Sequence, residues 1–156
     1  MPRKQAFSPE MEGQFAVPME QMISALCDLL SCKYAIEMAY RSFSDRVRGP
    51  WRDGLVEHWQ EHAKDERQGS YDLAMKIIGL GGDPNICHIG YDPSGPDVTA
   101  FCHTLAKMEL DMIAKAQKVV DYSGDNTALR VMAENIMELD THHLDDLRRM
   151  CPEMPL

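Results

Sequence analysis

Apolar residues recur at every third or fourth position in four long segments of the chain. These segments cover about residues 19–48, 52–80, 97–123 and 126–150. A spacing of three and four residues places side chains on one face of an α-helix. The period of two that a half-buried strand requires is not found in any segment. We therefore predict four helices and no sheet.

Glycine and proline interrupt the periodicity between these segments. Gly49 and Pro50 are expected to end the first helix, because glycine adopts the left-handed cap conformation and proline cannot continue a helix. Asp125 is expected to cap the last helix. The stretch 81–96 is rich in glycine and proline, and when extended it spans roughly 50 Å, enough to return the chain along a helix of about 40 Å. The sequence thus predicts an all-α bundle of two antiparallel hairpins joined by a long crossover.

One charged residue, Lys33, stands in the apolar stripe of the first segment. The stripe has a regular spacing of three and four and consists of Leu26, Leu29, Lys33, Ile36, Tyr40, Phe43 and Val47. Lys33 must therefore face the same interior as its apolar neighbours. Because a buried ammonium needs anionic partners to keep its proton, carboxylates from the other helices are expected around it.

Composition limits the classes of function. The chain has 156 residues, of which 25 are acidic and 16 basic, giving a net charge of −9, so nucleic acid is an unlikely partner. Five cysteines without a CxxC pair favour a reducing, cytoplasmic location. No apolar run approaches the roughly 18 residues of a membrane span. We expect residues 1–18 to form a flexible N-terminal arm and residues 19–156 to form one domain.

Polar residues on the inner stripes of the other three segments suggest a metal site. Carboxylate-bridged two-metal sites in helical bundles take one Glu from each of two helices and a Glu-x-x-His pair from each of the other two, since positions i and i+3 share a face. The corresponding positions here are Lys33 in the first segment, Glu66 with Gly69 in the second, Glu109 in the third, and Asp140 with His143 in the fourth.

Three short segments carry a family resemblance. They are Arg48-Gly-Pro-Trp51, Glu61-His-Ala-Lys-Asp-Glu66 and Leu80-Gly-Gly-Asp-Pro84. Over residues 19–150 the chain resembles the ferritin-like superfamily, and within it most closely the bacterioferritins and the small ferritins related to DNA-protecting cages. The resemblance implies a ferritin-like four-helix bundle and a di-iron site.

Both departures from the family layout fall on the same metal position. The resemblance implies that Lys33 replaces the Glu, and Gly69 the His, of the first metal, whereas Glu66, Glu109, Asp140 and His143 remain for the second. We hypothesise a single ion, iron or else manganese or zinc, with the Lys33 ammonium in place of the other cation. Glu37 and His62 are alternative ligands, one turn from Lys33 and Glu66 respectively.

The resemblance also implies a function and an assembly. It implies iron storage or oxidation in a homo-oligomeric cage of 12 or 24 chains. Oxidation is expected to be weakened, because two-electron reduction of peroxide or oxygen normally draws on two irons. The alternative is a non-catalytic scaffold in which Lys33 replaces metal by salt bridges. Haem is disfavoured, because Arg67 stands where the bacterioferritins carry a haem-binding methionine.

Overall fold

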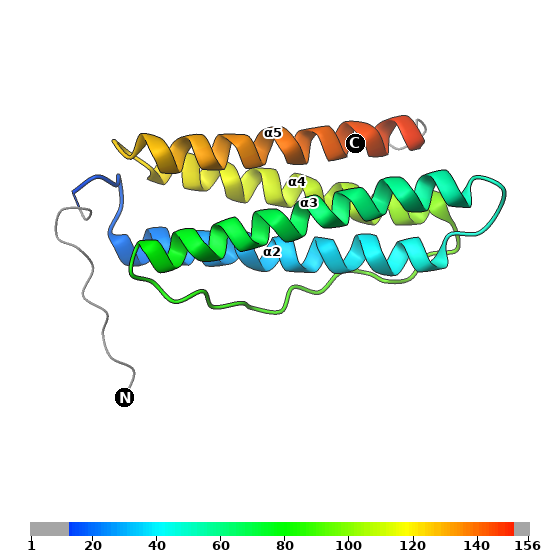
Figure 1. The fold of residues 1–156 in the computed structure, drawn as a ribbon, viewed down its shortest axis with the longest axis horizontal. Helices are drawn as coiled ribbons and strands as arrows, with labels where there is room; N and C mark the ends of the chain where they lie inside the picture. The colour runs from blue at the N-terminus through cyan, green and yellow to red at the C-terminus, as the bar shows by residue number, and fades with distance from the viewer. Residues whose placement is uncertain (1–12, 152–156) are drawn as a thin grey trace.

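The computed structural model describes residues 13–151 and consists of four long helices (Figure 1). No strand occurs within this range. The helices contain 24 to 28 residues each, which corresponds to lengths of roughly 36–42 Å. Their bounds are Met19–Arg46 (α2), Arg52–Gly79 (α3), Val98–Tyr122 (α4) and Thr127–Met150 (α5).

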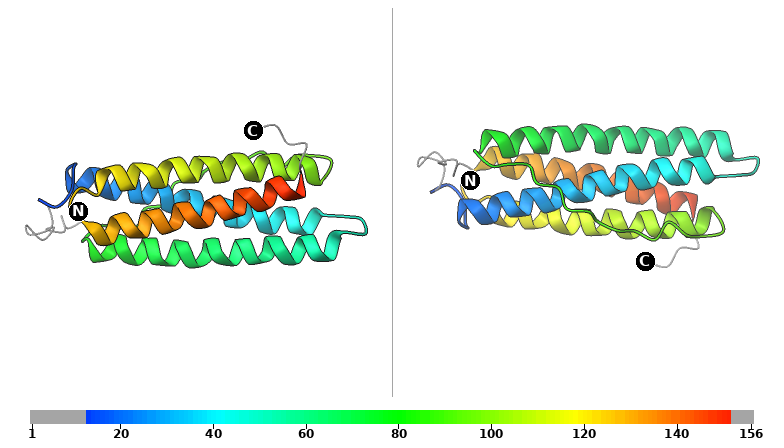
Figure 2. Two further views of the ribbon diagram at one scale, coloured as in Figure 1. Left: turned by 90° about the horizontal axis from the view of Figure 1, so that it is seen from above. Right: turned by 90° about the horizontal axis from the view of Figure 1, so that it is seen from below.

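The helices form two antiparallel hairpins, α2 with α3 and α4 with α5 (Figure 1). The connection between α3 and α4 runs the length of the bundle, so that α4 is parallel to α3. Figure 2 shows this crossover lying over α2 and α4. The predicted all-α architecture and its connectivity are therefore confirmed.

Hydrogen bonds fasten the crossover to α2. The backbone N–H of Cys87 donates to Oγ of Ser31 at 3.0 Å. Near the other end of the crossover, the Arg46 guanidinium donates to the backbone carbonyls of Pro93 and Gly95. The crossover therefore lies over one side of the bundle, and the side formed by α3 and α5 is not covered by it.

Two helix ends differ from the prediction. The first helix ends at Arg46, because Val47 has an extended backbone. The helix predicted from the apolar periodicity was therefore two residues too long at this end. Asn126, not Asp125, caps α5, since its Oδ1 accepts a hydrogen bond from the N–H of Leu129 at 2.9 Å. The last helix therefore begins at Thr127.

The predicted arm lies only partly within the described residues. Residues 1–12 lie outside them, as do residues 152–156 of the predicted domain. The N–H of Ala16 donates to the carbonyl of Tyr122 at 3.0 Å, and the carbonyl of Gln14 accepts from Asp125 at 2.8 Å. This part of the chain therefore packs against the turn between α4 and α5.

The four inner stripes meet in one apolar core that is interrupted by a polar layer. All seven residues of the α2 stripe are buried, including Lys33. The charged and imidazole side chains that are buried at this level are Lys33, Glu66, Glu109, Asp140 and His143. Long helices thus carry a group of ionisable residues in the interior of the bundle.

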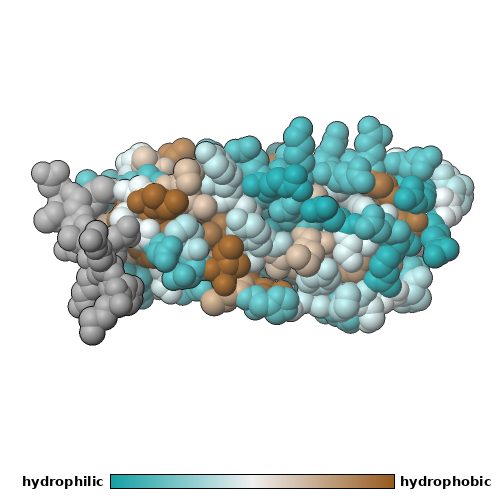
Figure 3. All heavy atoms as spheres, turned by 60° about the horizontal axis from the view of Figure 1, so that its bottom comes forward, coloured by the Kyte–Doolittle hydropathy of each residue, from teal (hydrophilic) through white to brown (hydrophobic). Residues whose placement is uncertain are grey.

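Several large apolar side chains remain on the surface. Trp51 is 82% exposed, Met38 63% and Met75 44%. Figure 3 shows the face that carries the crossover, where apolar side chains gather toward the end at which α2 begins and polar side chains cover most of the other end. Of the helices in residues 13–151, none is long and apolar enough to span a membrane.

Candidate metal centre

All four helices contribute to the polar layer. Glu66 comes from α3 and Glu109 from α4, while Asp140 and His143 lie three residues apart on α5 and therefore share its inner face. Each of these residues is at most 2% exposed. The structure thus brings together the four residues that the sequence suggested as ligands, and one ligand atom from each lies within 4.8 Å of the others.

The Lys33 ammonium lies between two of these carboxylates. Its Nζ is 2.7 Å from Oε2 of Glu66 and 3.3 Å from Oδ1 of Asp140. Burial alone lowers the pKa of Lys33, but the negative charges of the two carboxylates outweigh it and raise the pKa above its usual value. Lys33 therefore remains a cation in the interior.

Gly69 provides the space that the lysine side chain occupies. A Cβ atom at position 69 would lie 3.0 Å from Cε and 3.1 Å from Cδ of Lys33. Contacts this short require the lysine to shift, yet two carboxylates hold its ammonium in place. The two departures from the family layout are therefore one steric unit: any side chain at position 69 competes with Lys33 for the same volume.

Each of the four clustered residues keeps one buried polar atom that has no hydrogen-bond partner within the described part of the chain. These atoms are Oε1 of Glu66, Oε2 of Glu109, Oδ2 of Asp140 and Nδ1 of His143. Nδ1 of His143 lies 3.0 Å from Oε1 of Glu66 and 3.2 Å from Oε1 of Glu109, without hydrogen-bond geometry. Because buried polar atoms are nearly always satisfied, this donor set fits a metal ion.

The metal-free layer has strongly displaced pKa values. Burial raises the pKa of Asp140 to about 8, with Glu66 and Glu109 adding to the effect and Lys33 opposing it. Burial alone lowers the pKa of His143, but the carboxylates of Glu109 and Glu66 outweigh it and raise the pKa to about 10. Without a metal and near neutral pH, protons on Asp140 and His143 therefore balance part of the negative charge. Lys33 then forms its ion pair with Glu66 and donates a hydrogen bond to Oδ1 of the neutral Asp140.

Two further residues support the cluster from outside it. The Tyr40 hydroxyl donates to Oε1 of Glu109 at 2.6 Å, which leaves the other oxygen of Glu109 free. Asp65 Oδ2 lies 3.3 Å from Nε2 of His143. A carboxylate on the outer nitrogen of an imidazole fixes the ring and its tautomer. The sequence patterns did not predict a role for Asp65, although its position next to Glu66 was a usable signal.

The two alternative ligands lie outside the cluster. Glu37 accepts from Nε of Arg67 at 2.9 Å, so its carboxylate is paired at the edge of the bundle. Nε2 of His62 lies 3.3 Å from Oδ2 of Asp146. The His62 ring also stacks on His143, with centroids 4.0 Å apart. Neither side chain is therefore among the four that cluster in the layer.

A groove on the surface borders the lysine side of the layer. It lies between α3 and α5 and has a volume of about 760 Å³. Lys33 and Gly69 are among the residues that line it, together with Asp65 and the exposed Met75. Lys33 itself is fully buried, so the groove ends at its side chain without opening the layer to solvent.

The chain belongs to the ferritin-like domain family, whose profile matches residues 23–156. This family membership agrees with the all-α bundle, the long crossover and the ionisable layer described above. A search of curated protein sequences gave no significant match.

Two solved structures are similar to this chain. A ferritin-like, diiron-carboxylate protein from Bacillus anthracis strain Ames has a TM-score of 0.79 and 24% identity, over 85% of this chain and 96% of that one. A dodecameric thioferritin, the bacterioferritin-related protein of Bacteroides fragilis, has a TM-score of 0.83 and 21% identity, over 92% of this chain and 90% of that one. At these identities the similarity shows the ferritin-like fold, as predicted.

The steric link between Lys33 and Gly69 predicts a non-additive pair of substitutions. Lys33→Ala should cost about 3–5 kcal/mol of unfolding free energy, because it leaves buried carboxylates without their cation. Gly69→Ala should destabilise the wild-type protein through its contact with Lys33, but in the Lys33→Ala background it should stabilise the helix by up to about 1 kcal/mol. Urea denaturation of the four proteins in the presence of chelator measures the coupling.

Lys115→Ala is the matched control. Lys115 also forms an ion pair on a helix, with Asp111 at 2.8 Å, but on the surface. Its loss should change the unfolding free energy by no more than about 1 kcal/mol. If Gly69→Ala has the same effect with and without Lys33, the proposed steric unit is wrong.

Proposed function

We propose that this protein is a metal-binding ferritin of the iron storage or oxidation type that holds one divalent ion per subunit in the polar layer. Glu66, Glu109, Asp140 and His143 would be its ligands. The observation that carries the proposal is that each of these residues keeps one buried atom without a hydrogen-bond partner, while Lys33 occupies the other oxygens of Glu66 and Asp140.

Charge balance supports one ion in the layer. Three carboxylates, one ammonium, one neutral imidazole and one divalent cation sum to zero. Two divalent cations would leave two positive charges without partners in a fully buried layer, at a large cost. Lys33 also fills the volume next to Gly69, where the first metal of the family would take its imidazole.

The donor set favours particular ions. Three carboxylate ligands and one imidazole suit Fe(II), Mn(II) or Zn(II). Bound iron supplies one electron on oxidation, so coupled two-electron reduction of peroxide or oxygen should be slow. The chain's own contribution is to orient the carboxyl groups: Lys33 holds one oxygen each of Glu66 and Asp140, and Tyr40 holds one oxygen of Glu109.

We also propose that the subunits assemble into a closed homo-oligomer. The exposed Trp51 and Met38 are apolar side chains of the kind that subunit contacts bury, and the similar protein from Bacteroides fragilis is described as dodecameric. A shell of 12 or 24 chains would suit storage. Sedimentation equilibrium of the purified protein measures the number of subunits.

The ligand set predicts which substitution removes an ion. Glu109→Gln should lower the bound Fe(II), measured anaerobically per subunit, by one equivalent, because it removes a charged ligand of the buried site. Oxidation of Fe(II) by the wild-type protein, followed by absorbance, should be slow and should fall further in this variant.

Glu37→Gln provides the matched control for Glu109→Gln. It is the same substitution at a carboxylate that Arg67 holds outside the cluster, and it should leave the bound iron unchanged. Equal iron content in Glu109→Gln and wild-type protein would contradict the proposed site. No iron in either protein would favour the alternative, a non-catalytic scaffold in which the Lys33 salt bridges replace metal.

The displaced pKa values predict how metal affinity depends on pH. Asp140, with a pKa of about 8, and His143, with a pKa of about 10, both carry protons in the metal-free protein near neutral pH. Because both must lose a proton to bind a metal, binding should release protons, and the affinity should rise with pH up to about 10 and most steeply below about 8. Calorimetry in buffers of different ionisation enthalpy measures the number of protons released and the affinity for the metal. Affinity that does not change with pH would contradict this assignment.

A further inference from the structure

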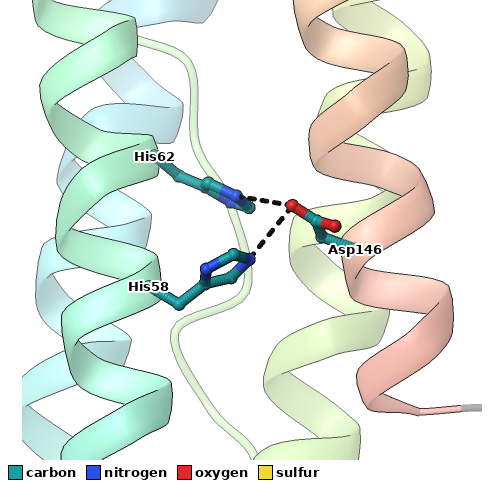
Figure 4. A group of neighbouring side chains, drawn as sticks. All are labelled: His58, His62 and Asp146. Atoms are coloured by element: carbon teal, nitrogen blue, oxygen red, sulfur yellow. Dashed lines mark hydrogen bonds and ion pairs between the residues drawn. The ribbon is translucent and has the colours of Figure 1, made fainter.

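A second group of metal-ligating side chains lies between α3 and α5. His58 and His62 are four residues apart and so project from successive turns of one helix face. Figure 4 shows both imidazoles directed at the carboxylate of Asp146 on α5. Nε2 of His58 is 3.0 Å from Oδ2 of Asp146, and Nε2 of His62 is 3.3 Å from the same oxygen.

The surroundings orient this group. Nη1 of Arg149 donates to Oδ1 of Asp146 at 3.1 Å, which leaves Oδ2 facing the two imidazoles. His62 is held by stacking on His143. Two ring nitrogens therefore meet at one carboxylate oxygen, and one ligand atom from each of the three side chains lies within 4.8 Å of the others.

The group is reachable from solvent. The His58 side chain is 37% exposed, whereas that of His62 is 5% exposed. An ion could therefore reach His58 from the surface without opening the core.

We infer that His58, His62 and Asp146 form a second binding site for a divalent transition-metal ion, Zn(II) or Fe(II). Two imidazoles and one carboxylate are ligands that such ions prefer, whereas Mg(II) and Ca(II) require a larger set of oxygen ligands. Three protein ligands leave at least one coordination position for water. The site is therefore open and exchangeable.

The second site lies next to the buried layer. His62 precedes Glu66 by four residues and Asp146 follows His143 by three, so the second site lies one helical turn, about 5.4 Å, along the bundle. The stacked rings of His62 and His143 form the boundary between the two clusters. An ion at the second site thus lies on the solvent side of the proposed buried ion.

Zinc binding to the assembled, metal-stripped protein tests this inference. The wild-type protein should bind one Zn(II) per subunit that the His58→Gln and Asp146→Asn variants do not bind. Where a variant still binds this ion, its affinity should be at least about tenfold weaker. Co(II) as a probe should give visible absorption bands whose intensity falls in the same two variants. His58 is partly exposed, so its replacement should leave the circular dichroism spectrum unchanged.

His142→Gln is the matched control, because it makes the same substitution at an exposed histidine on α5. It should retain the full Zn(II) content and the full Co(II) spectrum. The inference is overturned if His58→Gln and Asp146→Asn bind Zn(II) as wild type does. Glu109→Gln distinguishes the two sites: it should lose the buried ion and keep the ion that His58→Gln loses.

Discussion

The contacts of the Lys33 ammonium with the carboxyl groups of Glu66 and Asp140 are the interaction on which the arrangement of the buried layer depends. The contacts of 2.7 and 3.3 Å lie in a fully buried layer, where an unpaired charge of either sign would be costly. Gly69 favours the arrangement, because a Cβ at that position would lie only 3.0 Å from the lysine stem. We propose that this cation of the chain takes the place of one of the two metal ions of a diiron centre.

The sequence was enough to predict the helices, the crossover and the composition of the layer. Long segments with a regular period have only one way to bury their apolar faces, and Lys33 is inside because its neighbours in the stripe are. The helix ends were less predictable: the pattern does not reveal that Val47 leaves the helix or that Asn126 caps the last one. Caps depend on local backbone geometry that periodicity does not encode.

Contacts between side chains of different helices were harder to predict from the sequence than the helices themselves. The sequence patterns gave neither His58 nor Asp146 a role, since neither lies on an inner stripe. Their meeting depends on how α3 and α5 face each other, which is a property of the packed bundle. The i, i+4 spacing of His58 and His62 was the available signal, but it acquires meaning only with a carboxylate opposite.

An anomalous difference map at the metal edge, from crystals grown with Fe(II) or Mn(II), would count the ions that the buried layer holds. We expect one peak in the polar layer, within bonding distance of Glu109 and His143, with the Lys33 ammonium between Glu66 and Asp140. Two peaks in that layer, with the Lys33 side chain displaced toward solvent, would contradict it.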